Sequence, residues 1–555
     1  MTTFIKWIGR LILPGLSIFL LGSCHDRHAG GEGKTVFRYN EAANITSLDP
    51  AFARDQSVIW ATHQLFDGLV QLGDRLEILP SVARSWEISE EGTCYTFHLR
   101  MDVKFHDSPV FPGGKGRGVT AADFCYSFNR ITDGKVASPG SWIFNPVRKD
   151  GNGYSFKAPD DSTFIIRLAK PFPPFLGLLS TLYCSVLPKE AIDHYGPEFR
   201  RNPVGTGPFC FKMWKEGVKL VFTRNLHYFE NENGLALPYL DAVAITFLAD
   251  RQSAFLEFMK GNLDFMSGID PAYKDEILTR SGRLNPKYSG EIDMISRPYL
   301  NTEYLGFLID STLPVIKESP VRLKKIREAI NTCFDREKMI RFLRNNTGYP
   351  GIHGMIPPGM PGFDSSRVYW GYDPQRTRLL LAEAGFPGGQ GLPPVTLVST
   401  PDYLDICKYI QSQANEAGID LRIEINPPAA MKEMRAQAKV PFFRASWIAD
   451  YPDAENYLSL FYSRNFCPGG PNYTHFSNRA FDALYEKAMT IVDDSARYGL
   501  YRQMEDILMS ESPVVVLYYD QVLRFIHKDV HGLGINPMNL LTLKKVRKIA
   551  AIRGR

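Results

Sequence analysis

Alternating apolar residues mark several β-strands in the chain. Along residues 95–99, 164–168 and 243–247 every second side chain is apolar. Because neighbouring side chains of a strand point to opposite faces of a sheet, each segment predicts a strand with one buried face. Strand and turn signals are dense between about residues 70 and 200, which predicts a β-rich region there.

A helical pattern follows in the second half of the chain. Apolar residues recur at intervals of three and four along residues 323–343. This spacing places them on one face of a helix, so a helical segment is predicted between Pro320 and the breakers Gly348 and Pro350. Residues 377–386 predict a further helix.

The next elements form a strand, a helix and a second strand. The strand covers residues 395–398, the helix residues 402–417 up to Gly418, and the second strand residues 421–425. Such a unit places its two strands parallel in one sheet, with helices covering that sheet. The C-terminal half is therefore predicted to be α/β.

The N-terminus has the features of a secretory signal peptide. Lys6 and Arg10 precede an apolar run of 11 residues, Leu11 to Leu21, and polar residues follow Cys24. A membrane-spanning helix needs about 20 apolar residues, so the run is too short to be a permanent anchor. Residues 1–23 are predicted to be removed on export.

The end of this segment resembles a bacterial lipobox. In Leu21-Gly22-Ser23-Cys24 small residues precede the cysteine, and a polar, glycine-rich stretch follows it. The resemblance implies that Cys24 receives a lipid and that residues 24–33 form a tether. The alternative is ordinary cleavage near Ser23, with Cys24 incidental.

Charge and composition exclude some classes of protein. Cleavage removes two basic residues and no acidic one, so 64 basic residues become 62 against 60 acidic ones. This balance gives no basic surface for nucleic acid, and no nucleic-acid partner is predicted. With 44% hydrophobic and 22% charged residues, the chain has the composition of a globular protein, and its length predicts two or three domains.

The cysteines give no metal-binding pattern. Apart from Cys24, seven remain, and no two of them are separated by two to four residues. A structural zinc site is therefore disfavoured, and no metal or other cofactor is predicted. Export makes disulfides chemically possible, but the spacing does not reveal a pairing.

At this point a series of short segments identifies the family. The segments are residues 47–50, 66–70, 79–87, 95–100, 103–107, 202–209, 304–307, 326–330, 335–337, 356–360, 372–374, 380–385 and 447–452. In this order they resemble the family 5 extracellular solute-binding proteins, the oligopeptide and dipeptide permease components, along nearly the whole mature chain. Ser108 to Gly118 departs from the family pattern and is expected to be a longer surface loop.

The resemblance implies an α/β fold of the periplasmic binding protein type (type II, cluster C), with two lobes, an extra domain and a hinged ligand cleft. Hinges are expected near Arg297-Pro298-Tyr299 and Tyr518-Tyr519-Asp520. The expected domains are domain I from residues 34–60, 189–297 and 521–555, the β-rich domain II from 61–188, and domain III from 298–520.

The resemblance also implies a function and site residues. A peptide in water carries an ammonium, a carboxylate and unpaired amides, so its receptor needs an anion, a cation and strand edges. In the oligopeptide-binding relatives an aspartate holds the ammonium, an arginine six residues earlier can hold the carboxylate, and a tryptophan lines a side-chain pocket. These roles fall on Asp450, Arg444 and Trp447. The structural alternatives are a surface turn, an ion pair and core packing, respectively.

The resulting hypothesis is a monomeric, extracytoplasmic lipoprotein, held to the membrane by lipid at Cys24. It would bind short peptides and deliver them to an ABC permease in the inner membrane. Other solutes remain open, namely a cell-wall tripeptide, a nickel chelate or haem. A lipoprotein hydrolase or an adhesin is the alternative from another class, although no Gly-x-Ser-x-Gly, His-Glu-x-x-His or phosphate-loop motif supports an enzyme.

Overall fold

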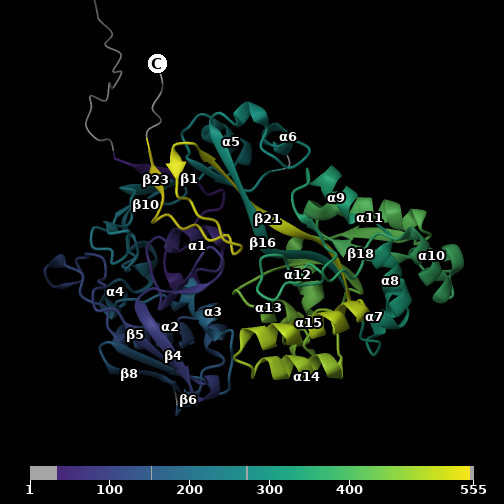
Figure 1. Cartoon of the computed structure of the whole chain (residues 1–555), viewed down its shortest axis with the longest axis horizontal. Helices are drawn as coiled ribbons and strands as arrows, with labels where there is room; N and C mark the ends of the chain where they lie inside the picture. The colour runs from purple at the N-terminus through teal and green to yellow at the C-terminus, as the bar shows by residue number, and fades with distance from the viewer. Residues whose placement is uncertain (1–33, 152, 271–272, 550–555) are drawn as a thin grey trace, which may run out of the picture. The chain divides into compact units, whose positions relative to one another are not determined.

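An 11-stranded β-sheet is the largest element of the structure (Figure 1). The computed structural model describes residues 34–151, 153–270 and 273–549, and those from Thr35 onward belong to one unit. In spatial order the strands are β10 (Phe209–Lys215), β11 (Lys219–Arg224), β14 (Ala242–Thr246), β1 (Val36–Asn40), β15 (Phe265–Ser267), β21 (Val514–His527), β16 (Ile292–Phe307), β20 (Phe442–Ile448), β18 (Val395–Ser399) and β19 (Leu421–Ile425), with β17 (Tyr349–Pro350) paired to β21.

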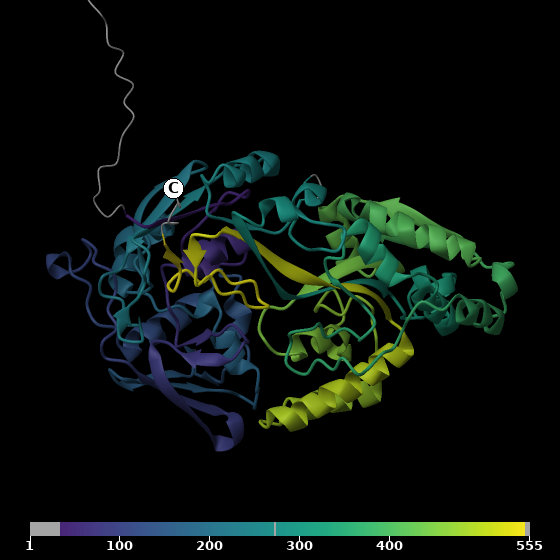
Figure 2. The ribbon, with the colours of Figure 1, turned by 45° about the horizontal axis from the view of Figure 1, so that its top comes forward.

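Two long strands join the N-terminal and C-terminal parts of this sheet. The 16-residue β16 and the 14-residue β21 pair antiparallel, side by side in Figures 1 and 2. β15 pairs with the C-terminal end of β21, whereas β20 pairs with the C-terminal end of β16. The pairing register of β16 with β21 shifts between Pro298 and Thr302, so the ladder between these two strands is irregular where the two parts of the sheet meet.

The C-terminal part of the sheet is buried on both faces. Val514 and Val516 of β21 pack in a core with α14 and α15, while Val515 and Leu517 pack in a second core with α8 to α11. Both faces therefore need apolar side chains, which explains the unbroken apolar run in β21. The helices are α8 (Lys324–Thr332), α9 (Arg336–Leu343), α10 (Pro374–Glu383), α11 (Leu404–Glu416), α12 (Pro428–Ala436), α14 (Arg479–Ala488) and α15 (Asp494–Glu511).

The predicted strand, helix, strand unit is confirmed, but the long helical segment is interrupted. β18 and β19 pair in parallel with α11 between them in sequence, and Gly418 has a φ of 94°. After Pro320 the chain forms α8 and α9 in place of one helix. The break occurs because Asp335 adopts an extended conformation and its side chain accepts the backbone N–H of Lys338 at 3.0 Å, which starts a new helix.

The β-rich region predicted between about residues 70 and 200 is also confirmed. Its four-stranded antiparallel sheet has the order β4-β5-β9-β8. α2 (Ala121–Thr132) lies beside this sheet (Figure 1) and packs on it through Phe124 and Phe128. Both rings lie within 6 Å of Phe164 on β9. The strands are β4 (Ala83–Ser89), β5 (Cys94–Leu99), β8 (Phe156–Asp160) and β9 (Thr163–Arg167).

Short elements complete the described chain. The helices are α1 (Gln56–Thr62), α3 (Phe175–Leu179), α4 (Lys189–Tyr195), α5 (Arg251–Met259), α6 (Lys274–Ile277), α7 (Pro314–Lys317) and α13 (Glu455–Leu458). The two-stranded sheets pair β2 (Val70–Leu72) with β3 (Ile78–Pro80), β6 (Lys149–Asp150) with β7 (Gly153–Tyr154), β12 (Asn231–Glu232) with β13 (Leu235–Ala236), and β22 (Val530–His531) with β23 (Arg547–Lys548).

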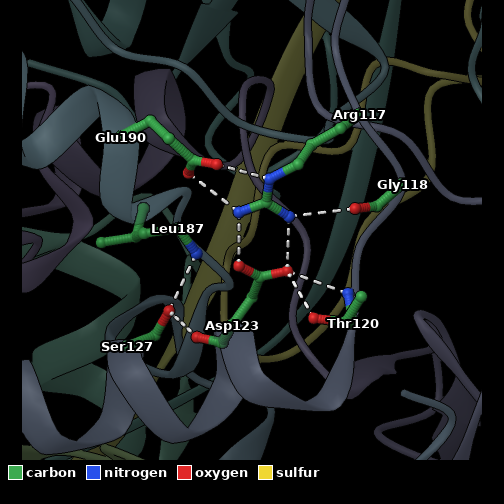
Figure 3. A network of polar contacts seen from close by, with 7 residues as sticks. All are labelled: Arg117, Gly118, Thr120, Asp123, Ser127, Leu187 and Glu190. Atoms are coloured by element: carbon green, nitrogen blue, oxygen red, sulfur yellow. Dashed lines mark hydrogen bonds and ion pairs between the residues drawn. The ribbon is translucent and has the colours of Figure 1, made fainter. Parts of the chain in front are cut away.

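The insertion at residues 108–118 is tied to the body of the β-rich region at its C-terminal end (Figure 3). The Arg117 guanidinium donates two hydrogen bonds to Asp123 on α2, at 2.7 and 2.8 Å, and two to Glu190 on α4, at 2.6 and 2.8 Å. It also lies over the Phe105 ring, 5.1 Å from the centroid. Bidentate pairing of this kind fixes the geometry of an arginine, so this end of the loop has a defined position.

The remaining sequence predictions concern the N-terminal segment, the cysteines and membrane-spanning helices. The predicted signal segment, the tether up to Gly33 and the predicted lipidation site Cys24 lie outside the described residues. The seven cysteines in the described ranges are free. Within those ranges no helix has the length and apolar character that a membrane span requires.

Candidate functional site

The predicted site residues come from one strand and the turn that follows it. Arg444 and Trp447 lie on β20, which pairs antiparallel with β16 and contacts β18 on its other side. Asp450 follows two residues after the strand ends. β20 therefore holds the start of this segment in the sheet, while Asp450 is carried on the loop beyond the sheet edge.

Asn456 on α13 orients this loop. Its side-chain oxygen accepts hydrogen bonds from the Trp447 indole N–H at 2.8 Å and from the backbone N–H of Asp450 at 3.1 Å. Its amide nitrogen lies 3.4 Å from the Asp450 carboxylate. Asn456 is buried, so one fixed amide sets the positions of both predicted site residues. The sequence reasoning missed Asn456 because a lone asparagine carries no pattern.

Asp450 lines a cavity of about 360 Å³. Its carboxylate makes no ion pair within the described part of the chain, although Arg54 also lines the cavity. The Asp450 side chain is exposed, at the cavity, yet desolvation by the surrounding protein raises its pKa, and the contact with Asn456 opposes this shift in part. A carboxylate placed against protein without a cation is set up to accept one from a ligand.

The rest of this cavity comes from the N-terminal part of the chain, from β16 and from the C-terminal segment 538–540. Trp60 on α1 is buried, and its indole N–H donates to the Asn539 carbonyl at 2.8 Å. Burial, reinforced by the charge of Asp450, raises the pKa of Tyr183 to about 12, so its hydroxyl keeps its proton. The lining residues are Ala53, Arg54, Gln56, Ile59, Trp60, His63, Leu72, Trp142, Ser180–Tyr183, Tyr299, Ile448–Asp450 and Met538–Leu540. An apolar wall with a few polar groups is typical of small-molecule sites.

Arg444 and Trp447 do not line this cavity. Arg444 forms a buried ion pair with Glu303 on β16, and its guanidinium lies over the Tyr403 ring, 3.1 Å from the centroid. Trp447 packs against the core that includes α14 and α15. The structure thus brings Trp447 and Asp450 together through Asn456, and it places Arg444 in a separate polar cluster.

A second cavity of about 380 Å³ adjoins the first. The two share the lining residues Gln56, Trp60, Tyr299 and Asn539. Asp520 lines the second cavity and accepts a hydrogen bond from Arg344 at 2.6 Å, while Arg344 also lies over the Tyr518 ring. α1 and β16 therefore contribute to the walls of both cavities.

The described residues contain no group of three or more His, Cys, Asp or Glu side chains arranged to hold a metal ion. His106 is a histidine whose ring contacts the protein itself: its Nε2 lies 2.9 Å from the Gly207 carbonyl oxygen, and burial lowers its pKa to about 4.

The fold is that of the type II periplasmic binding proteins, the class that the family resemblance implied: a mixed sheet joins two parts of the chain, with a cavity between N-terminal and C-terminal elements. The particular family follows from a direct match. Residues 77–466 match the bacterial extracellular solute-binding proteins, family 5, so the chain belongs to this family. It is an extracytoplasmic solute-binding protein.

Known proteins of this kind resemble the chain over nearly its whole length. The dipeptide-binding protein of Escherichia coli (strain K12) is 24% identical over 485 residues, covering 83% of this chain and 84% of that protein. Helicobacter pylori DppA, solved in complex with the peptide STSA, is 25% identical with a TM-score of 0.72, covering 93% of this chain and 98% of DppA. The periplasmic murein tripeptide binding protein MppA, in its unliganded open form, is 24% identical with a TM-score of 0.78, covering 94% and 98%.

Proposed function

We propose that the protein captures short peptides in the cavity lined by Asp450 and delivers them to the permease of an ABC importer. One observation carries the proposal: a carboxylate without an ion-pair partner in the described chain lies in a cavity of about 360 Å³. A free peptide supplies the missing cation through its α-ammonium. The peptide-binding relatives named above support this choice of ligand.

The identity of the ligand is tested by mass spectrometry of small molecules that co-purify with the mature chain. A series of short peptides with a free amino terminus is the expected result. Recovery of a nickel chelate, haem or a sugar instead would contradict the proposal. A cell-wall tripeptide would narrow the proposal to one peptide class, and MppA is a structural neighbour named for such a ligand.

For Arg444 the proposal requires an exchange of partners. Its guanidinium is bound to Glu303, so it pairs with a peptide carboxylate only by leaving that contact. Amidating the C-terminus of a bound peptide should then weaken binding to the unmodified protein and have little further effect on Arg444→Ala. If amidation weakens binding to the unmodified protein and to Arg444→Ala by the same factor, the peptide carboxylate binds a group other than Arg444. Trp447 is proposed to contribute through Asn456, which also holds Asp450.

We propose domains I, II and III with the boundaries given above, and hinges near Arg297–Tyr299 and Tyr518–Asp520. The shift in register between Pro298 and Thr302 supports this location, because β16 and β21 connect the two parts of the sheet there. A peptide held by both lobes favours the closed state. Small-angle scattering should show a smaller radius of gyration with saturating peptide, and superimposable profiles would contradict the hinge.

The remaining proposals concern the anchor and the fate of the ligand. Lipid on Cys24 holds a monomer at the membrane, and the ligand is released chemically unchanged. The glycine-rich stretch that follows Cys24 supports a tether. Incubation of peptides with the purified protein should leave their masses unaltered, and appearance of hydrolysis products would favour the hydrolase alternative.

A further inference from the structure

The second cavity carries an unequal set of charges. Three carboxylates line it, those of Glu41, Asp270 and Asp520, against a single lining arginine, Arg251. Asp520 is paired with Arg344, and Asp270 lies 3.3 Å from Arg251. Glu41 alone among the three forms no ion pair within the described residues. The cavity therefore has one carboxyl group without a cationic partner among the described residues.

One oxygen of the Glu41 side chain also has no hydrogen-bond donor among the described residues. It follows directly after β1, and its Oε1 atom is buried without a hydrogen-bond partner. The hydroxyl of Tyr39, two residues earlier, is likewise buried without a partner. A buried polar atom left without a partner costs about 1–3 kcal/mol. Glu41 lines the second cavity and Tyr39 does not, so Glu41 is the one of the two whose carboxyl group is placed to meet a polar group of a ligand.

The walls of the cavity suit the stem of a long cationic side chain. Trp60 and Phe265 present aromatic rings, and Met266, Val522 and Leu523 add aliphatic surface. Methylene groups pack on such a surface while a charged head group reaches a carboxylate, and an aromatic face also attracts a cation. Burial raises the pKa of Glu41 to about 8, which reflects how little the surrounding protein stabilises its charge.

We propose that the second cavity is a subsite for a cationic side chain of the ligand, an ammonium or guanidinium group, and that Glu41 is its counter-ion. The inference rests on the proposed function, because the peptide is held by its α-ammonium at Asp450 and extends past Trp60 and Tyr299, which line both cavities. The protein then selects short peptides that carry lysine or arginine after the first residue.

The test compares matched tripeptides by calorimetry on the mature chain. Ala-Lys-Ala and Ala-Ala-Lys are compared with the same peptides containing norleucine, which keeps the methylene stem and removes the charge. At one of the two positions lysine should bind roughly 10- to 100-fold more tightly, the range that a charge-assisted hydrogen bond supplies. In Glu41→Gln this ratio should fall to about 3 or less.

Controls separate the subsite from the rest of the site. Glu41→Gln should bind the norleucine peptides as the unmodified protein does, which also shows that it is folded. Glu318→Gln, at an exposed position after α7, should keep the lysine preference. Asp450→Asn should weaken all four peptides and preserve the ratio.

Two results would overturn the inference. The first is a ratio of lysine-peptide affinity to norleucine-peptide affinity that is the same in the unmodified protein and in Glu41→Gln. This result would show that the second cavity is not a cation subsite, and it would leave the proposed function intact. Failure of all four peptides to bind the unmodified protein would overturn the proposed function and the subsite with it.

Discussion

The substitution Asp450→Asn tests the proposed ligand contact directly. The change removes the negative charge and keeps the size of the side chain. The backbone N–H of residue 450 still has its acceptor on Asn456, so the loop should keep its position. Trp447 keeps its own bond to Asn456. The fold should therefore survive, and the effect should appear in ligand binding.

The size of the effect follows from the surroundings of Asp450. A charge-assisted hydrogen bond contributes about 1.5–3 kcal/mol, and leaving a desolvated ammonium without a counter-charge costs more. Binding should therefore weaken by roughly 10- to 1000-fold. Because desolvation by the surrounding protein raises the pKa of Asp450 in the empty site, affinity for a free peptide should also fall as the pH drops toward that pKa, and Asp450→Asn should lose this dependence.

Calorimetry on four combinations isolates the contact: the unmodified protein and Asp450→Asn, each with a free and an N-acetylated peptide. Acetylation should cost the unmodified protein a factor similar to the mutation, and it should add little to the mutant, because both changes delete one interaction. Asp402→Asn, at an exposed position that lines neither cavity, serves as the control. Equal binding of free and acetylated peptides to the unmodified protein would refute the reasoning.

Three further predictions address the anchor, the insertion and a buried acid. Cys24→Ala should move the protein from the membrane to the soluble fraction of cells, and persistent membrane association would contradict the lipid anchor. Asp123→Asn should lower the free energy of unfolding by about 1–2 kcal/mol in a denaturant titration, because Arg117 loses one of its two bidentate partners; an unchanged midpoint would argue against this tie. Burial raises the pKa of Glu505 to about 8, so the folded state retains a proton that the unfolded state loses near pH 4.5, and stability should fall as the pH rises between these values. Glu505→Gln should flatten this profile, and parallel profiles for both proteins would contradict the shift.

Local patterns in the sequence determined much of the fold. The parallel pair of β18 and β19, with α11 between them, follows from alternation and helical spacing within about thirty residues. The break at Asp335 was missed, because apolar spacing continues across it and only the capping hydrogen bond reveals it. Family motifs pointed to Asp450, and the structure places it in a cavity.

The composition of the site was decided by the tertiary structure. The second cavity is lined from three separate regions of the chain, by Glu41 and Trp60, by Tyr299 and by Asn539. These regions meet only because β1, α1 and β16 are assembled around one sheet with the C-terminal segment. The ion pair of Arg444 with Glu303, 141 residues earlier, arises in the same way from the pairing of β20 with β16. Periodicity records the local preference of a backbone, whereas the partners of a buried charge depend on which strands become neighbours.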